Sequence, residues 1–367
     1  MTRITHCHST RVDQHELILR NRLGRFTMNA RFRRALIPVA LVTAVAALTT
    51  GCGRGDDSGS DDFKIAIVTR NFTNPYWAAL RDGAKAEAEA LGVRVDVQAG
   101  QSETDADGEN AQISTMAAQG YDCFGVVPVN STNVITPLTP VARKDIPILN
   151  LDTQIDAKAS EAAGVSYASF IGSDNLDAGR IAGERMVQAL GGSGKVVMLQ
   201  GIAGEQNGIN RDQGFSDAVA GKLEIVQKAP ADYEQDKGLQ VTEAMLRAHP
   251  DITGVFAAND TMGLGAAQAI KNAGKSEQIK VISVDGIQAA LDAVRSGDLY
   301  GTVTQYPYAE GQLAVQGCLA LHQGKTLPSR VVAPIAFIGA DNVEQQIEAF
   351  PRPIVAFDNP IEGLLDK

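Results

Sequence analysis

The chain is poor in the residues that carry metal, redox and disulfide chemistry. Its 367 residues include four cysteines, five histidines and one tryptophan, and aromatic residues make up only 5% of the total. Cys7 and Cys52 lie in the N-terminal part, which leaves Cys123 and Cys318 for the rest of the chain. Two cysteines do not make a disulfide framework or a metal cluster. We expect both to be buried free thiols, with a single bridge between them as the alternative, and we predict no metal and no cofactor.

Positive charge is also scarce beyond residue 51. The formal net charge is -10, but the first 51 residues hold eight arginines and only two acidic residues. The remaining residues therefore carry 25 basic and 41 acidic side chains. This acidic balance argues against nucleic acid as a partner.

The apolar segment near the N-terminus, residues 35–50, is shorter than the roughly 20 residues that a membrane-spanning helix needs. It follows arginines within residues 31–34 and ends just before Cys52. This order is typical of a secretory signal peptide. We therefore predict an N-terminal extension at residues 1–27, a signal peptide at residues 28–51 with translation starting at Met28, and a flexible Gly/Ser/Asp-rich tether at residues 52–62.

Residues 48–52, with the sequence LTTGC, resemble the lipobox of bacterial lipoproteins, in which the cysteine receives lipid and becomes the mature N-terminus. The resemblance implies that Cys52 is lipidated and that the protein contacts the membrane through this lipid. Thr49 departs from the motif, because a large aliphatic residue usually stands at that position. The alternative is an ordinary secretory signal next to an unrelated cysteine.

From residue 63 onward, short β-branched segments alternate with longer helical patterns. The predicted strands are residues 64–68, 93–98, 124–127, 146–151, 195–199, 224–229, 254–257, 280–284, 301–304 and 331–337. Helical patterns include residues 76–91, 107–119, 177–190 and 308–321. This alternation predicts an α/β fold with doubly wound parallel sheets. We interpret residues 170–172, a short strand-like segment, as a crossover between two domains, and residues 350–367 as irregular.

Ligands of open α/β sheets bind beyond the carboxyl ends of the strands. The residues that we select at these ends are Asn74, Tyr76, Trp77, Asp152, Arg211, Tyr233, Asn259, Asp285 and Gln305. Their carboxylates, amides and guanidinium suit the hydroxyl groups of a neutral polyol, and their aromatic rings suit its C–H faces. A phosphate would instead favour a Gly-rich turn and more positive charge. We predict that these nine residues bind a sugar and that none is catalytic.

Each selected residue also has an ordinary structural role as its alternative. Asn74 could serve simply as a helix cap without contacting a ligand. Arg211 could form a surface ion pair, and Gln305 could be a hinge residue. Asp260, which follows Asn259, we assign to a turn or a helix cap.

The motifs of common enzymes are incomplete or absent. Residues 269–276 end in Gly-Lys-Ser but lack the first glycine of a phosphate loop, and the glycines at residues 263 and 265 lack the third glycine of a dinucleotide fingerprint. Residues 105–108 form a truncated calcium loop, and neither G-x-S-x-G nor H-E-x-x-H occurs. We therefore predict that the protein is not an enzyme.

Several motifs between residues 63 and 338 resemble those of the type I periplasmic sugar-binding proteins of the ribose-binding kind. They are Asn74-Pro75-Tyr76-Trp77, Asp82-Gly83-Ala84, Ser173-Asp174-Asn175, residues 199–204 (LQGIAG), Pro230-Ala231-Asp232-Tyr233, residues 256–260 (FAAND), Val284-Asp285-Gly286 and Gln305. The resemblance implies two Rossmann-like lobes joined by a three-crossing hinge near residues 170–173, 305–306 and 332–334. The same nine strand-end residues would form the sugar site between the lobes.

The implied N-terminal lobe comprises residues 63–172 and 306–333, and the C-terminal lobe comprises residues 173–305 and 334–345, followed by an irregular appendage at residues 346–367. Thr153 and Ile209 stand where the ribose-binding pattern has arginines, and Val127 stands where it has an asparagine. Because one unmatched buried polar group costs about 1–3 kcal/mol, these departures leave the identity of the sugar open.

The resemblance implies an extracytoplasmic binding protein that captures a monosaccharide, a ribose-like pentose or a hexose, by closing its cleft. It would deliver the sugar to the membrane permease of an ABC importer, as a lipid-anchored monomer in the periplasm or at the outer face of the cytoplasmic membrane. One alternative is a sensor that presents a sugar or a furanosyl signal to a membrane receptor. Another is the effector domain of a repressor, against which the export signal and the acidic charge argue.

Overall fold

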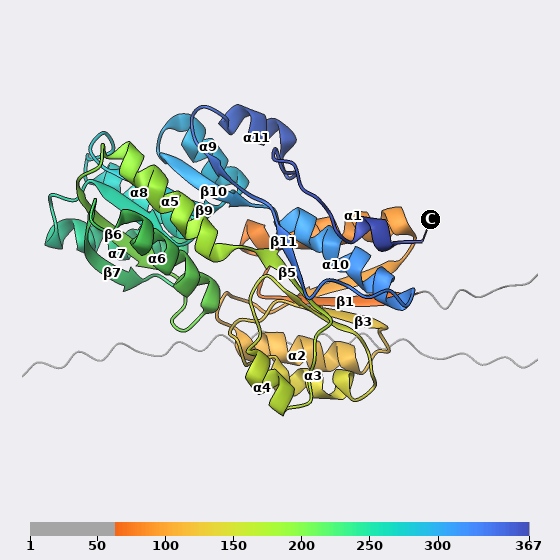
Figure 1. The fold of residues 1–367 in the computed structure, drawn as a ribbon. Helices are drawn as coiled ribbons and strands as arrows, with labels where there is room; N and C mark the ends of the chain where they lie inside the picture. Colours follow the sequence, from red (N-terminus) through yellow and green to blue (C-terminus); the bar gives the residue numbers. More distant parts are fainter. Residues whose placement is uncertain (1–62, 367) are drawn as a thin grey trace, which may run out of the picture. The chain divides into compact units, whose positions relative to one another are not determined.

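A computed structural model describes residues 63–366, which contain two six-stranded sheets, each covered by helices on both faces (Figure 1). This architecture confirms the predicted pair of α/β lobes. The predicted signal peptide, tether and lipid site at Cys52 lie outside the described residues. Within residues 63–366, no helix has the length and apolar character needed to cross a membrane.

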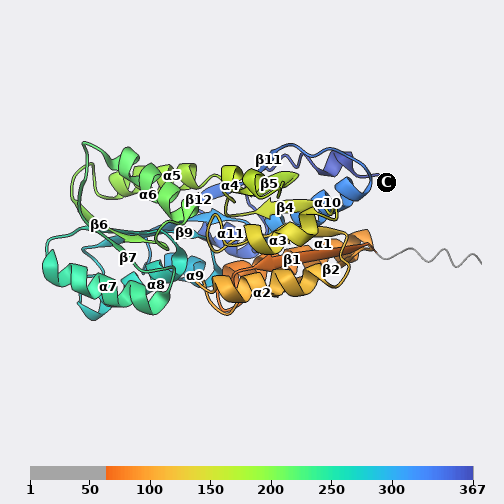
Figure 2. The ribbon, with the colours of Figure 1, turned by 90° about the horizontal axis from the view of Figure 1, so that it is seen from below.

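The sheet of the first lobe has the strand order β11-β5-β4-β3-β1-β2, and all neighbouring strands run parallel. Its strands are β1 (Lys64–Thr69), β2 (Arg94–Ala99), β3 (Cys123–Val126), β4 (Ile148–Leu151), β5 (Ser169–Ser173) and β11 (Arg330–Ala333). Helices α1 (Pro75–Leu91) and α10 (Pro307–His322) cover one face, and α2 (Ala106–Ala117) and α3 (Ile135–Ala142) cover the other (Figures 1 and 2). The short helix α4 (Ala157–Ala162) precedes β5. Because both faces are covered, β1 and β3 are almost continuously apolar and buried.

The sheet of the second lobe has the order β12-β10-β9-β8-β6-β7, in which only β12 runs antiparallel to its neighbour. Its strands are β6 (Lys195–Gln200), β7 (Glu224–Pro230), β8 (Gly254–Ala257), β9 (Lys280–Asp285), β10 (Gly301–Gln305) and β12 (Ile335–Ile338). Helices α5 (Asn175–Ala189) and α6 (Gln206–Val219) pack on one face. Helices α7 (Gln235–Ala248), α8 (Asp260–Asn272) and α9 (Gln288–Ser296) pack on the other, and α11 (Val343–Ala349) packs against α9.

Four helices that begin at the carboxyl ends of strands do so through side-chain caps. Asn74, Asp174, Glu205 and Asn259 precede α1, α5, α6 and α8, and each accepts a hydrogen bond from a backbone N–H of the following turn. The caps fix where these helices start. The first turns of α1 and α6 consequently contribute side chains to the region between the lobes.

Close packing of α1 against α10 explains the glycine of the Asp82-Gly83-Ala84 motif. A Cβ atom at Gly83 would lie 2.0 Å from the carbonyl oxygen of Tyr308, which no side chain can tolerate.

The strand-like crossover predicted at residues 170–172 is confirmed, since these residues belong to β5, which pairs with both β4 and β11, and the chain enters the second lobe directly after it. Two other predictions need correction. Residues 331–337 form two strands, β11 and β12, in different sheets, because the chain changes lobes at the intervening Pro334. The prediction of two free thiols is wrong, since Cys123 of β3 and Cys318 of α10 form a disulfide whose Cα atoms are 5.8 Å apart.

The chain passes between the two lobes after β5, after β10 and between β11 and β12. The C-terminal residues make a fourth passage (Figure 1). They leave α11 on the second lobe, and Asn359 then donates a hydrogen bond to Gln316 of α10 at 2.7 Å. Ile361 is fully buried just before a short 3-10 helix (Glu362–Leu364). Residues 350–366 have little regular structure, but they pack on the first lobe.

Candidate ligand-binding site

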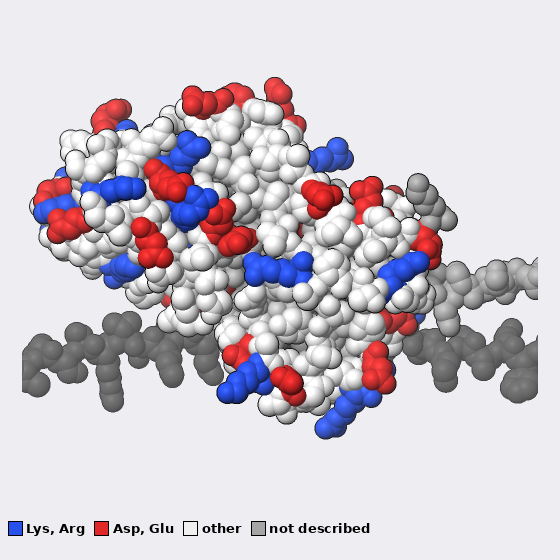
Figure 3. Space-filling model, in the orientation of Figure 1, with Lys and Arg blue, Asp and Glu red and all other residues white. Residues whose placement is uncertain are grey.

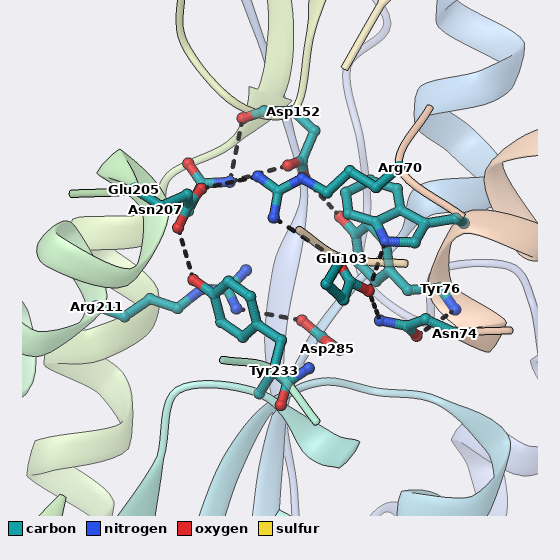
Figure 4. A pocket seen from close by; sticks show the side chains of 12 residues that line it. Arg70, Asn74, Tyr76, Glu103, Asp152, Glu205, Asn207, Arg211, Tyr233 and Asp285 are labelled. Carbon is teal, nitrogen blue, oxygen red and sulfur yellow. Dashed lines mark hydrogen bonds and ion pairs between the residues drawn. The ribbon is translucent and has the colours of Figure 1, made fainter. Parts of the chain in front are cut away.

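A cavity lies between the two lobes at the carboxyl ends of the strands. It is lined by Arg70, Asn74, Tyr76, Trp77, Glu103, Asp152, Glu205, Asn207, Arg211, Tyr233, Asn259 and Asp285 (Figure 4). Three of these side chains are aromatic and the others are polar or charged, as in sites that orient a small ligand through a few polar groups.

Eight of the nine residues that we selected from the sequence line this cavity. The exception is Gln305, which lies behind it at the end of β10. Its side-chain oxygen accepts a hydrogen bond from Arg211 Nη2 at 2.9 Å, and its nitrogen donates to Asn175 Oδ1 at 2.9 Å. Gln305 therefore orients Arg211.

The first turn of α1 forms one wall of the cavity. The rings of Tyr76 and Trp77 meet edge to face with centroids 4.7 Å apart, and both side chains are buried. Tyr76 Oη donates to Asp152 Oδ2 at 3.0 Å, and Trp77 Nε1 donates to Glu103 Oε1 at 2.9 Å. Asn74 caps the helix and also donates from Nδ2 to Glu103 at 2.8 Å. Its capping role and its place in the cavity wall thus coexist.

Arg211 of α6 enters the cavity from the second lobe. It is buried, donates to the carbonyl oxygen of Ala258 at 2.6 Å, and lies 3.3 Å from Asp285 Oδ1. The alternative of a surface ion pair is therefore wrong. Burial opposes the charge of Arg211, but Asp285 and other neighbours outweigh it and hold the pKa of Arg211 above its usual value.

The pKa values of Asp285 and Tyr233 are both raised. Burial raises the pKa of Asp285 well above its usual value, although Arg211 opposes the shift. Burial likewise raises the pKa of Tyr233, whose hydroxyl donates to Glu205 Oε2 at 2.6 Å. Asp285 thus lies in the cavity wall as the ion-pair partner of Arg211.

Four residues of the cavity wall were missed at the sequence level: Arg70, Glu103, Glu205 and Asn207. The sequence did contain a signal for all four residues. Arg70 directly follows β1, Glu103 follows β2, and Glu205 and Asn207 follow β6, so the strand-end rule covers them all. The selection stopped at one or two residues per strand end and left these out.

The guanidinium of Arg70 lies beside Thr153, although position 153 itself departs from the ribose-binding pattern. Its Nη2 donates to Thr153 Oγ1 at 2.7 Å and to Glu205 Oε1 at 3.0 Å, so a guanidinium that starts from β1 lies beside position 153. The neighbouring carboxylates outweigh the effect of burial and hold the pKa of Arg70 above its usual value. Ile209 is exposed and Val127 is buried in the core, and neither lines the cavity.

Direct hydrogen bonds join the lobes beside the cavity. Arg70 of the first lobe contacts Glu205 of the second, and Asn207 Nδ2 of the second lobe donates to Asp152 Oδ1 of the first at 2.9 Å (Figure 4). Burial raises the pKa of Glu205, but Arg70 and hydrogen bonds from Tyr233 and Gly208 reverse the shift and lower it overall. The Arg70–Glu205 contact is therefore a buried ion pair.

Asp260 lies outside the cavity, but its assignment to a turn or helix cap is wrong, because Asn259 caps α8 and the Asp260 carboxylate binds groups of β9, β10 and the loop after β9. Its carboxylate accepts hydrogen bonds from the hydroxyl of Thr302 at 2.7 Å and from the backbone N–H groups of Gly286 and Ile287 at 2.6 and 2.9 Å. Among residues 63–366, no group of three His, Cys, Asp or Glu side chains is arranged to hold a metal ion. On the face drawn in Figure 3, positive and negative side chains are interspersed.

Two parallel-sheet lobes with a polar, aromatic-lined cavity between them define a two-lobed small-molecule binding protein. The chain belongs to the periplasmic binding protein family, since the model of the periplasmic binding protein domain matches residues 65–326. It is 32% identical to the D-allose-binding periplasmic protein of Escherichia coli (strain K12), over 72% of this chain and 86% of that protein. It is 33% identical to the ribose import binding protein RbsB of the same strain, over 79% of this chain and 95% of that protein.

A solved structure is similar as well. An ABC transporter periplasmic solute binding protein from Actinobacillus succinogenes 130z with bound D-allose matches with a TM-score of 0.74 and 31% identity, over 77% of this chain and 99% of that one.

Proposed function

We propose that the protein is an extracytoplasmic substrate-binding protein that captures a monosaccharide between its lobes and delivers it to an ABC importer. The observation that carries the proposal is the cavity itself. Two guanidiniums, four carboxylates, three amides and three aromatic rings line it between the two lobes. Hydroxyl groups can pair with the polar groups, while the C–H faces of a sugar ring can pack on the aromatic rings.

The relatives support the same class of ligand. The similar proteins in Escherichia coli are named for allose and ribose, and the similar solved structure holds D-allose. These sugars are a hexose and a pentose, so the relatives support a monosaccharide without selecting one.

The contact residues that we propose are the eight selected residues that line the cavity, with Gln305 orienting Arg211. Tyr76, Trp77 and Tyr233 supply the aromatic surfaces. Asn74, Asn259, Asp152, Asp285 and Arg211 supply hydrogen-bonding groups from both lobes. Because both lobes contribute, the sugar stabilises the closed arrangement, and the closed lobes present one surface to the permease.

We also propose that the mature protein is a monomer anchored through lipid on Cys52 in the periplasm or at the outer face of the cytoplasmic membrane. Mass spectrometry of the mature N-terminus tests the anchor, because an unmodified Cys52 contradicts it. Light scattering coupled to size-exclusion chromatography tests the oligomeric state.

A titration of the purified protein with pentoses, hexoses and polyols tests the binding function. Trp77 is the only tryptophan of the chain and lines the cavity, so its fluorescence reports occupancy directly. We expect one sugar to give a saturable change and to raise the melting temperature through ligand linkage.

Arg211→Lys should weaken the binding of that sugar, because lysine cannot reproduce the fork of donors. Arg295→Lys, at an exposed arginine of the same lobe, is the matched control and should bind like the wild type. The absence of any response across the panel would refute the proposal. Chemical turnover of the bound sugar would refute our expectation that the protein is not an enzyme.

A further inference from the structure

Glu103 has one satisfied and one unsatisfied carboxylate oxygen. Oε1 accepts hydrogen bonds from Trp77 Nε1 at 2.9 Å and from Asn74 Nδ2 at 2.8 Å. Oε2 is buried and has no hydrogen-bond partner among residues 63–366. A buried carboxylate oxygen without a partner is costly, so this atom has the character of a group held ready for a ligand.

Arg70 presents the complementary group. Its Nε donates to the carbonyl oxygen of Pro128 at 3.3 Å, and its Nη2 donates to Thr153 and Glu205. Nη1 makes no hydrogen bond within the described part of the chain, and it lies 3.7 Å from Glu103 Oε2. This distance is too long for a direct hydrogen bond but short enough for a single oxygen atom to contact both groups.

The opposite charges of Arg70 and Glu103 determine which ligand group can lie between them. An ammonium group would be repelled by Arg70, and a carboxylate or phosphate would be repelled by Glu103. A hydroxyl group satisfies both, because its oxygen accepts from the guanidinium while its hydrogen is donated to the carboxylate.

We propose that Arg70 Nη1 and Glu103 Oε2 together bind one hydroxyl group of the sugar and select the sugar by the position of that hydroxyl. This inference rests on the proposed function and deepens it. The pair belongs to the first lobe and lies beside Trp77, whereas Arg211 and Asp285 approach the cavity from the second lobe (Figure 4). Arg70 thereby supplies a guanidinium to the cavity, whereas Thr153 and Ile209, which stand where the ribose-binding pattern has arginines, supply none.

The test combines one variant with a series of deoxy sugars. The sugar that binds most tightly in the panel is compared with each of its monodeoxy analogues, first on the wild-type protein. We expect one deoxy position to weaken binding by about 10- to 100-fold, as the loss of a hydrogen bond to a charged group predicts.

Glu103→Gln keeps an acceptor for Trp77 and Asn74 and replaces Oε2 by an amide nitrogen. The variant should bind the parent sugar about 10- to 100-fold more weakly, and the penalty at that one deoxy position should fall below about 3-fold, because the hydroxyl no longer has its acceptor. Penalties at the other positions should stay unchanged.

Glu109→Gln is the matched control. Glu109 is another buried glutamate of the first lobe, and one of its carboxylate oxygens has no hydrogen-bond partner in the part of the chain that the structure describes, but it does not line the cavity. Its variant should keep the wild-type profile across the deoxy series. Arg70→Lys provides a second route to the same comparison if Glu103→Gln does not fold.

Deoxy penalties that are the same in the wild type and in both cavity variants would overturn the inference. Failure of the wild-type protein to bind any sugar would instead refute the proposed function, so the two failures are distinguishable.

Discussion

Asp260 holds the loop that presents Asp285 to the cavity. Its carboxylate is fully buried and accepts hydrogen bonds from Ser283, Thr302 and two backbone N–H groups of the loop after β9. Asp260→Asn would turn an amide nitrogen toward some of these donors. We expect the variant to lose about 2–4 kcal/mol of unfolding free energy and to bind sugar more weakly, because the loop around Asp285 shifts.

Denaturant unfolding and sugar titration check this expectation for Asp260. The control is Asp251→Asn, which removes an exposed ion pair with Lys195 and should cost less than about 1 kcal/mol. Equal stabilities of the two variants would contradict the role that we assign to Asp260.

At the level of single residues, the sequence identified the site wherever a side chain able to bind hydroxyl groups stands at the end of a predicted strand. Tyr76, Trp77 and Asp285 stand at strand ends and carry groups that bind hydroxyls, so they could be selected without a structure. Arg70 and Glu103 occupy equally good positions, but their significance comes from each other. Their relation depends on the packing between the end of β1 and the loop after β2, which no local pattern encodes.

Glu109 connects helix α2 to the loop after β3, and it makes the stability of this element depend on pH. Its Oε2 accepts from the backbone N–H of Val129 and from Asn133 Nδ2. Burial nevertheless raises the pKa of Glu109 from 4.5 to about 7. The folded state therefore binds this proton more tightly than the unfolded state does. Its stabilising contribution is fully present below about pH 4.5 and is lost as the pH rises to about 7.

Glu109→Gln mimics the protonated acid and removes this dependence. Relative to the wild type, we expect the variant to gain up to about 3 kcal/mol of unfolding free energy between pH 4.5 and pH 8. Urea unfolding at both pH values measures the difference. A difference that is constant with pH would mean that Glu109 has the same pKa in the folded and unfolded states, which contradicts the expectation.

The disulfide between Cys123 and Cys318 ties strand β3 to helix α10 across 195 residues of sequence. A cross-link of this span restricts the unfolded chain strongly, and native disulfides typically contribute about 2–4 kcal/mol. We expect a reducing agent to lower the melting temperature of the wild type and to leave that of the Cys123→Ala/Cys318→Ala variant unchanged. Equal melting of the oxidised and reduced wild type would contradict this role.

The order of helices and strands followed from hydrophobic patterns, but the pairing of two short strands and the disulfide did not. Residues 169–173 and 330–333 form neighbouring strands, although they are far apart in the sequence. Their strand character could be predicted, but their pairing could not, because the local pattern does not contain it. The same holds for Cys123 and Cys318, whose apolar surroundings suit a free thiol and a disulfide equally well.

At the scale of the whole molecule, the C-terminal residues link the two lobes, and their amino-acid composition did not predict this link. Prolines and weak periodicity suggested an irregular appendage. The structure shows residues 350–366 running from α11 on the second lobe to α10 on the first, where Lys325 of the first lobe contacts Asp366. Tertiary contacts rather than helical or strand propensity hold this segment, so no periodic pattern could reveal it.

The bonds between the lobes imply that the protein itself contributes to closure, in addition to the sugar. Asn207 Nδ2 donates to Asp152 Oδ1 at 2.9 Å and to Thr153 Oγ1 at 3.1 Å, and both bonds cross between the lobes. Asn207→Ala removes them. We expect its ligand-free ensemble to be more open, with a larger radius of gyration by X-ray scattering than that of the wild type. Asn210→Ala, one turn further along α6, is the control.

The effect of Asn207→Ala on affinity separates closure from direct contact. Apparent affinity scales with the fraction of molecules that can close, so a variant that only opens the ensemble should weaken every sugar of the panel by the same factor, about 5- to 30-fold for two lost hydrogen bonds. The order of preference among sugars would then stay that of the wild type. A changed order would show that Asn207 reads the sugar itself, and an unchanged radius of gyration would show that its bonds to Asp152 and Thr153 do not set the balance between open and closed lobes.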